Sequence, residues 1–360
     1  MLTMTVYCYY LCFSLFVILS HSDTLVQLTD IHYDPDYHVG APDHCFSDLF
    51  NMRCCHTADI PRHPYQNASV WGNHNCNTPP VLVEASLRWI SRVIQPNVIL
   101  YTGDSVDHQA YSQSITKNMH AVRSVAQLFQ RIFPDIPVLS THGNHDTFPV
   151  DQTLPYVYPY MLKNMGAYWA HWMTPKSLHQ YQSNGYYSQN VFTRLDVVSF
   201  NSIPYNTHNM FGSHDLKANQ WRWLNATLHT SVKNERSVWF MSHYPPHSSS
   251  QTNAFRDTLN RHIRPYIQHI KGFFFGHTHR DECKMMYDTW VAQISPSLMP
   301  TQKGACFRTY EYNQTTHTLN DYSLYCADIT KDHLTFRKVF SYCDMYNGVG
   351  DACGLTCKAV

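Results

Sequence analysis

Short apolar runs alternate with longer helical stretches from Leu25 to about Leu298. The runs that predict buried strands span residues 25–28, 98–101, 137–140, 197–200, 238–241 and 273–275. Helical spacing predicts a helix over residues 83–94, with Leu87, Ile90 and Ile94 on one face, and a longer helix over residues 116–133. Strands that alternate with helices predict an α/β fold with largely parallel strand pairing.

Polar side chains follow five of the predicted strands, at the point where each strand ends. The five clusters are Asp30-Ile31-His32, Gly103-Asp104, Gly143-Asn144-His145-Asp146, Ser242-His243 and Gly276-His277-Thr278-His279. In open α/β sheets the loops at the carboxyl ends of strands build the active site. We therefore expect these clusters to meet in one functional site.

Two segments depart from this alternation. Residues 45–80 are rich in Cys, His, Asn and Pro and contain few apolar runs, so we expect a disulfide-stapled insertion in the catalytic domain, which spans residues 23–327. Residues 328–360 are short and contain cysteines, which favours a C-terminal cap on that domain that is too small to fold alone.

The first 22 residues are typical of a signal peptide. An apolar run from Met4 to Leu19 precedes the small polar residues Ser20, His21 and Ser22, and it is short for a membrane span. An uncleaved signal anchor is the alternative. The chain ends without an apolar tail, so we expect no lipid anchor there and no stable membrane anchor.

Cysteines and glycosylation sequons agree with export from the cytosol. Two of the 12 cysteines lie in the leader, and the even number that remains fits disulfides in an oxidising compartment. Asn67, Asn225 and Asn313 each begin an Asn-X-Ser/Thr sequon. We expect a secreted, glycosylated protein in the extracellular space or the lysosome.

Composition narrows the function further. Apolar residues make up 44% of the chain and charged residues 14%, which predicts a packed core. The formal net charge is zero, so the basic excess of a nucleic-acid binder is missing and we expect no binding to a nucleic-acid duplex. The count of 24 histidines is high, and histidine is the commonest metal ligand.

The five clusters combine imidazoles with carboxylate and amide oxygens, a ligand set that suits zinc, manganese or iron better than calcium. In an extended segment residues i and i+2 point to the same side, so Asp30 with His32, and His277 with His279, can each aim at one ion. Glycines at 103, 143 and 276 would let the backbone turn and approach the ions. A shared carboxylate would hold two ions about 3.5–4 Å apart, the arrangement that suits phosphoryl transfer.

In their order along the chain, D-x-H, G-D, G-N-H-D, a lone His after a strand and G-H-x-H resemble the calcineurin-like metallophosphoesterase superfamily. The opening residues 28–37, Trp71-Gly72, Thr102-Gly103-Asp104 with His108 four residues on, and Ser295-Pro296-Ser297 are similar to the acid sphingomyelinase and acid sphingomyelinase-like phosphodiesterases. The resemblance implies a four-layer α/β/β/α sandwich with two mixed sheets.

The same resemblance implies a role for each site residue. Asp30, His32 and His279 match the ligands of one zinc ion, and Asn144, His243 and His277 match those of a second, with Asp104 as the bridge. A metal-bridging hydroxide would attack phosphorus. His145 matches the general acid that protonates the leaving oxygen, and His108 matches a histidine that contacts the phosphate. The cysteine arrangement implies disulfides Cys45–Cys54, Cys55–Cys76 and Cys353–Cys357.

Two departures from acid sphingomyelinase bear on the substrate. From the leader and the first predicted strand we expect no saposin-like domain of the kind that presents lipid, and we expect the family's helical C-terminal region to be shortened. We therefore expect a monomeric zinc phosphodiesterase for small nucleotide- or phosphocholine-type substrates. The alternatives are a sphingomyelin phosphodiesterase, a phosphomonoesterase, and a non-catalytic secreted protein that binds lipid or nucleotide.

Overall fold

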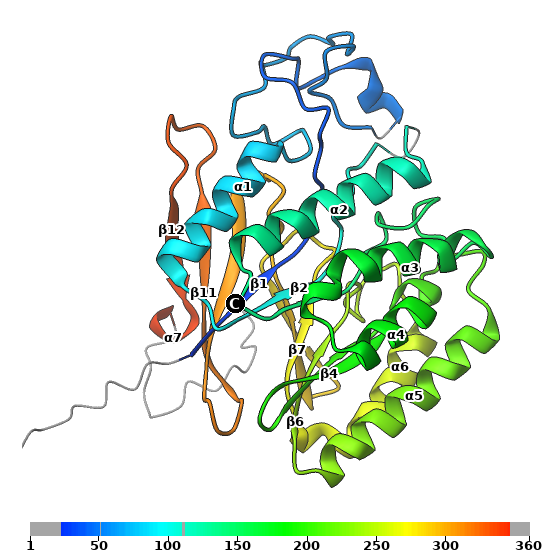
Figure 1. Cartoon of the computed structure of the whole chain (residues 1–360). Helices are drawn as coiled ribbons and strands as arrows, with labels where there is room; N and C mark the ends of the chain where they lie inside the picture. Colours follow the sequence, from blue (N-terminus) through cyan, green and yellow to red (C-terminus); the bar gives the residue numbers. More distant parts are fainter. Residues whose placement is uncertain (1–22, 51, 110–111, 346–360) are drawn as a thin grey trace, which may run out of the picture.

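Two six-stranded sheets face each other at the centre of the computed structural model, which describes residues 23–50, 52–109 and 112–345 (Figure 1). In spatial order the first sheet contains β12 (Phe336–Ser341), β11 (Leu319–Ala327), β10 (Ala305–Tyr312), β1 (Asp23–Leu28), β2 (Val98–Tyr101) and β3 (Val138–Ser140). The second contains β4 (Tyr187–Phe192), β5 (Leu195–Ser199), β6 (Ser237–Met241), β7 (Ile270–Phe275), β9 (Trp290–Ile294) and β8 (Glu282–Met286).

Alternating side chains along the strands build three hydrophobic layers. Leu25 and Leu100 of the first sheet share the central layer with Trp239 of the second. Their chain neighbours point the opposite way, because successive strand residues face opposite sides of a sheet. The outward-facing side chains of the first sheet pack against α1 (Pro80–Trp89) and α2 (Ile115–Ile132). The outward-facing side chains of the second sheet pack against α5 (His214–Lys233) and α6 (Asn253–Ile263). The predicted four-layer α/β/β/α sandwich with two mixed sheets is confirmed.

The remaining helices lie at the edges of these layers or in loops. They are α3 (Val157–Trp169), α4 (Pro175–Asn184), α7 (Tyr342–Met345) and the short helices η1 (Phe46–Phe50), η3 (Ala170–Trp172), η4 (Ile203–Tyr205) and η5 (Arg264–His269). The helix predicted over residues 83–94 begins earlier, as α1, and its last turn widens into the π-helical η2 (Ile90–Ile94). Among the described residues no helix is long and apolar enough to cross a membrane.

The expectation of largely parallel pairing was wrong for half of the strand pairs in the two sheets. Five of the ten pairings between described strands are parallel, and the other five are antiparallel. The antiparallel pairs lie mainly in residues 282–341, where β8–β9 and β10–β11–β12 are joined by short connections that need no crossover helix. The described part of the predicted cap adds β12 and α7 to this region.

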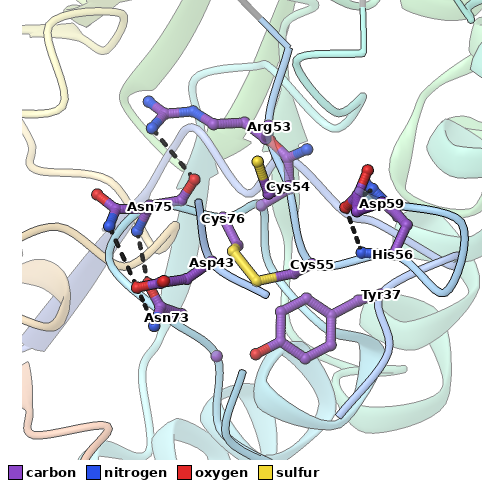
Figure 2. Close-up of a disulfide and its surroundings, with 12 residues drawn as sticks. Tyr37, Asp43, Arg53, Cys54, Cys55, His56, Asp59, Asn73, Asn75 and Cys76 are labelled. Carbon is purple, nitrogen blue, oxygen red and sulfur yellow. Dashed lines mark hydrogen bonds and ion pairs between the residues drawn. A yellow bond between two sulfur atoms is a disulfide. The ribbon is translucent and has the colours of Figure 1, made fainter. Parts of the chain in front are cut away.

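The described residues of the segment 45–80 form no long element besides the start of α1, and two disulfides hold the segment together, of which Figure 2 shows Cys55–Cys76. The pairs are Cys45–Cys54 and Cys55–Cys76, the pairings that the family resemblance implied. A third disulfide that the sequence did not suggest, Cys306–Cys326, joins directly opposed residues of β10 and β11. The predicted signal peptide (residues 1–22) and the pair Cys353–Cys357 lie outside the described residues.

A buried ion pair joins the two sheets beneath the predicted site. The side chain of Arg308, on β10, is fully buried, and its Nε lies 2.6 Å from Asp281 Oδ1 in the loop before β8. The guanidinium also donates to Gln293 Oε1 (3.0 Å) and to the carbonyl oxygen of Glu282 (3.0 Å). A buried charge of this kind is tolerated only because its donors are satisfied.

We expect Arg308→Ala to lower the free energy of unfolding by roughly 3–5 kcal/mol, because it leaves Asp281 without its partner in a buried setting. Urea unfolding measures this change. Arg337→Ala is the matched control, since Arg337 is exposed on β12 and its loss should cost less than about 0.5 kcal/mol. Equal urea midpoints for the two variants would show that the Arg308–Asp281 pair does not hold the sheets together.

Candidate metal centre

The five polar clusters come together at the carboxyl ends of five strands drawn from both sheets. β1, β2 and β3 of the first sheet lead into the loops that carry Asp30, Asp104 and Asn144. β6 and β7 of the second sheet lead into the loops that carry His243 and His277. Parallel strands bring their carboxyl ends to one edge, and the facing of the two sheets brings both edges together.

One group of metal-ligating atoms is formed by Asp30, His32 and His279. The Nε2 atoms of His32 and His279 are 3.1 Å apart, and Asp30 Oδ1 lies 3.3 Å from His279 Nε2 and 3.7 Å from His32 Nε2. Asp30 Oδ1 is buried and has no hydrogen-bond partner. An orphaned buried carboxylate oxygen beside two converging ring nitrogens fits a cation at this position.

A second group is formed by Asp104, His243 and His277. His243 Nε2 lies 2.9 Å from Asn144 Oδ1 and 3.3 Å from Asp104 Oδ2. The same Asp104 Oδ2 is 3.6 Å from His32 Nε2 of the first group. Asp104 therefore stands between the two groups, where one carboxylate could serve two ions.

Backbone carbonyls select the ring nitrogen that each buried histidine presents to the site. His32 Nδ1 lies 2.7 Å from the carbonyl oxygen of Val106, and His243 Nδ1 lies 2.8 Å from that of Thr102. A carbonyl oxygen only accepts, so each Nδ1 carries the hydrogen. Both Nε2 atoms are left facing the site, as metal-ligating histidines require.

Electrostatics favours the neutral, ligating form at two of these histidines. Burial lowers the pKa of His32 to about 4 and that of His277 to about 3. His243 differs: burial opposes its charge, but the adjacent Asp104 carboxylate raises its pKa to about 9. Burial and repulsion from Asp104 also raise the pKa of Asp146 to about 7. Positive charge near the Asp104 and Asp146 carboxylates is thus favourable, and a divalent cation would supply it.

The ligand loops have unusual backbone geometry. The positive φ angles are 50° at Asp30, 47° at His32, 60° at Asp104, 72° at His277 and 59° at His279. The expectation that these pairs lie in extended segments was therefore wrong. Asp30 and His32 still converge on one group of ligand atoms, but His277 and His279 belong to different groups, so the expectation that they aim at one ion was wrong as well. A non-glycine residue in this region costs roughly 1–3 kcal/mol and persists only where its surroundings over-determine it.

Asp146 supplies much of that restraint. Its carboxylate accepts hydrogen bonds from the backbone N–H groups of Gly143, Asp104, Ser105 and Val106, at 2.7–3.2 Å. Two of these N–H groups, those of Asp104 and Ser105, lie on either side of the Asp104 Cα, where the backbone is left-handed. Asp146 thus ties the loop after β3 to the loop after β2, a role that sequence reasoning missed even though the residue belongs to the predicted motif.

The close approach of neighbouring atoms explains why glycine occupies positions 103, 143 and 276. A Cβ at Gly143 would lie 2.0 Å from Asp104 Oδ1, and one at Gly276 would lie 2.0 Å from Thr29 Oγ1 and 2.8 Å from Asp30 Oδ2. Gly103 has a φ of 98°, and a Cβ there would lie 2.5 Å from the backbone nitrogen of Gly143. The three positions thus have no room for a side chain beside the ligand loops, and the expected approach of the backbone to the ions stays a prediction.

His145 and His108 lie beside the first group. The His108 ring stacks on His32 with centroids 3.8 Å apart, and the His145 ring meets that of His108 at 4.5 Å. The backbone N–H of His145 donates to Asp104 Oδ1 (2.9 Å), while the ring atom His145 Nδ1 has no hydrogen-bond partner. Asn118 of α2, another residue that sequence reasoning missed, donates to the carbonyl oxygens of His145 and Thr147.

Comparison with known proteins agrees with this geometry. The family described as calcineurin-like phosphoesterase matches residues 24–281. The chain is a member of that family. Its recognition from the order of five motifs is thereby confirmed, and the dinuclear metal centre typical of the family fits the two ligand groups that share Asp104.

Relatives within the family are named phosphodiesterases. The chain is 29% identical over 345 residues to sphingomyelin phosphodiesterase A of Dictyostelium discoideum, an alignment that covers 90% of this chain and 57% of the relative. It is 27% identical over 338 residues to human cyclic GMP-AMP phosphodiesterase SMPDL3A, with 87% and 72% covered. The chain thus spans little more than half the length of the first of these relatives.

Among solved structures, a dimetal phosphatase from Danio rerio superposes with a TM-score of 0.54 at 13% identity. The superposition covers 84% of this chain and 95% of that chain. At this identity the likeness concerns the fold alone, and it agrees with the two-sheet architecture.

We expect Gly143→Ala to displace the Asp104 carboxylate and so to reduce bound metal per chain by at least half, as measured by plasma mass spectrometry. Gly40→Ala is the control for a glycine replacement without a clash: Gly40 has a positive φ (89°), so alanine strains the backbone there, but an added Cβ meets nothing within 4 Å. Only loss of metal confined to Gly143→Ala supports the close-approach argument. Wild-type metal content in Gly143→Ala would contradict it.

Proposed function

We propose that this chain is a secreted, zinc-dependent phosphodiesterase that hydrolyses phosphodiester or phosphoanhydride bonds in nucleotide- or phosphocholine-type substrates. The observation that carries the proposal is the sharing of Asp104 Oδ2 between two groups of buried ligands, at 3.6 Å from His32 Nε2 and 3.3 Å from His243 Nε2. A carboxylate placed in this way suits a pair of hydrolytic metal ions.

Under this proposal Asp30, His32 and His279 hold one zinc ion, Asn144, His243 and His277 hold the other, and Asp104 bridges them. The two ions would supply a nucleophile at neutral pH and neutralise charge on the phosphate. The chain's own residues orient the substrate and move protons. This division of the ligands into two sets follows the two groups of converging ligand atoms that share the site.

His145 is the proposed general acid. Its Nδ1 has no hydrogen-bond partner, its ring lies 5.1 Å from that of His32, and its backbone is anchored to Asp104. A proton held here can be transferred to the leaving oxygen, which otherwise departs as a poor leaving group. His108, stacked on His32, is proposed to contact the phosphate.

Export from the cytosol is supported by disulfides and exposed glycosylation sequons in the described part of the chain. The disulfides Cys45–Cys54, Cys55–Cys76 and Cys306–Cys326 favour an oxidising compartment. Asn67, Asn225 and Asn313 are all exposed, as glycosylation requires. We propose a secreted or lysosomal glycoprotein that works as a monomer.

A second candidate, sphingomyelin hydrolysis to ceramide and phosphocholine, is favoured by the name of the Dictyostelium relative, sphingomyelin phosphodiesterase A. A non-catalytic protein that binds lipid or nucleotide is the third, and the complete set of converging ligand atoms argues against it, because binding alone does not require two metal sites. A phosphomonoesterase would be distinguished by release of inorganic phosphate from monoesters.

The metal assignment predicts about two zinc ions per purified chain. We expect a chelator to abolish hydrolysis and added zinc to restore it. Asp104→Asn should reduce zinc binding at both sites, because it weakens a shared ligand, whereas His279→Ala should reduce it mainly at one. Equal zinc loss in the two variants would contradict the bridging role of Asp104.

The substrate assignment is tested with sphingomyelin in mixed micelles, cyclic GMP-AMP, ATP, CDP-choline and bis-p-nitrophenyl phosphate at pH 5 and pH 7.5. We expect cleavage of the soluble substrates. Strong cleavage of sphingomyelin alone would favour the second candidate. A zinc-loaded chain that cleaves none of them would favour the non-catalytic one.

We expect His145→Ala to lower kcat by roughly 10²–10⁴-fold on substrates with alkoxide leaving groups. The loss should be much smaller on bis-p-nitrophenyl phosphate, because nitrophenolate leaves readily without a proton. An equal loss on both kinds of substrate would assign His145 a role other than general acid.

A further inference from the structure

A side chain of the disulfide-stapled insertion reaches the active-site histidine His108. Asn77 is fully buried, and its Oδ1 lies 2.9 Å from His108 Nδ1. The same Oδ1 accepts a hydrogen bond from the backbone N–H of His108 (3.2 Å). One amide oxygen therefore binds both the ring and the backbone of this histidine.

The orientation of the Asn77 amide is fixed from both ends. A backbone N–H only donates, so the atom that faces it on Asn77 must be the oxygen. On the other side, Asn77 Nδ2 lies 3.5 Å from Asp34 Oδ2, a carboxylate that only accepts. Asp34 is itself held by His56 Nε2, at 2.9 Å.

This orientation determines which nitrogen of His108 is free to act. Because Asn77 Oδ1 can only accept, His108 Nδ1 must carry the hydrogen between them. His108 Nε2 is thereby left for the side of the ring that lies against His32 and His145. Without the amide, the ring could rotate about its side-chain bonds or exchange its tautomer.

The backbone around Asn77 is restrained on both sides. Cys76, directly before it, forms the disulfide with Cys55 (Figure 2). Thr78, directly after it, donates its N–H to the carbonyl oxygen of His32 (3.0 Å) and accepts from the N–H of Asp34 (2.9 Å). The end of the insertion thus lies beside the loop that carries Asp30 and His32.

We propose that Asn77 is a positioning residue that holds His108 in one tautomer and one ring orientation, so that Nε2 faces the substrate. The inference rests on the proposed phosphodiesterase activity and extends it, because it gives the insertion a function in the reaction. The Cys55–Cys76 disulfide then serves the active site by fixing the chain on which Asn77 stands.

The neighbouring asparagines provide a contrast. Asn73 and Asn75 donate to Asp43 Oδ2, at 3.1 and 3.4 Å, within the insertion itself (Figure 2). Neither makes a hydrogen bond to His108 among the contacts of the described residues. Asn75→Ala is therefore a matched control that removes an insertion hydrogen bond without touching the active site.

The test is a double-mutant cycle on the zinc-loaded enzyme with the best substrate of the panel. We expect Asn77→Ala to lower kcat/KM roughly 10–100-fold, since small misplacements of active-site groups have effects of this size. In a His108→Ala background the same change should lower it less than about twofold, because Asn77 acts through His108. Asn75→Ala should stay within about twofold of wild type in both backgrounds. Effects of Asn77→Ala that multiply with those of His108→Ala would overturn the proposal.

A conservative variant separates positioning from support of the fold. Asn77→Asp keeps an acceptor oxygen for His108 but loses the donor to Asp34, so it should retain more than about a fifth of wild-type kcat/KM. If Asn77 only braced Asp34 and the insertion, Asn77→Asp would be at least as damaging as Asn77→Ala. Retention of less than about a fifth of wild-type kcat/KM by folded Asn77→Asp would overturn the proposal even if Asn77→Ala failed to fold.

Nitrogen NMR of ¹⁵N-histidine-labelled protein tests the geometry without relying on activity. The His108 signal, assigned by its loss in His108→Ala, should show the Nδ1–H tautomer in wild type and Asn75→Ala, and a tautomer mixture in Asn77→Ala. An unchanged signal in Asn77→Ala would overturn the inference. If the signal changes but wild type cleaves no substrate, the proposed function fails while the positioning contact stands.

Discussion

Four backbone N–H groups point at the buried carboxylate of Asp146, and the geometry of the metal centre depends on them. They come from Gly143, Asp104, Ser105 and Val106, so one side chain joins the loops after β2 and β3. This clamp helps to hold Asp104 in a left-handed backbone conformation that an aspartate seldom adopts. It also leaves Asp104 Oδ2 between the two groups of ligands, which requires that Gly143 carry no Cβ.

The site is also a product of how the two sheets face each other. The first sheet contributes Asp30, His32, Asp104 and Asn144, and the second contributes the remaining three histidines. Gln27 of β1 donates from its Nε2 to the carbonyl oxygen of Phe275 on β7 (2.8 Å), directly before Gly276. Together with the buried Arg308 network, this contact fixes one sheet against the other beneath the ligand loops. Rigid strands can then hold five strained loop residues at separations that suit two ions.

The insertion shows how a segment with little hydrophobic core can still position a side chain in the site. Its own buried apolar cluster consists of Cys55, Ala68 and Cys76, with Tyr37 packed against it (Figure 2). Disulfides replace the core that such a segment cannot build. The stapled chain then places Asn77 against His108, so an element that looks peripheral in the sequence bears on the orientation of an active-site ring.

By itself, the sequence determined the α/β class, six of the strands, the helix stripes and the residue types of the metal centre. These depend on local periodicity and on chemistry that follows each strand directly. Only the tertiary structure decided the antiparallel half of the strand pairings, the left-handed ligand backbones and the partners of Asp146, Asn77 and Arg308. The physical reason for these three sets of partners is that their main contacts join residues 30 or more positions apart, or the two sheets, where no local pattern records which partners meet. A buried carboxylate that binds backbone N–H groups and one that binds a metal have the same sequence signature, and only their neighbours in space distinguish them.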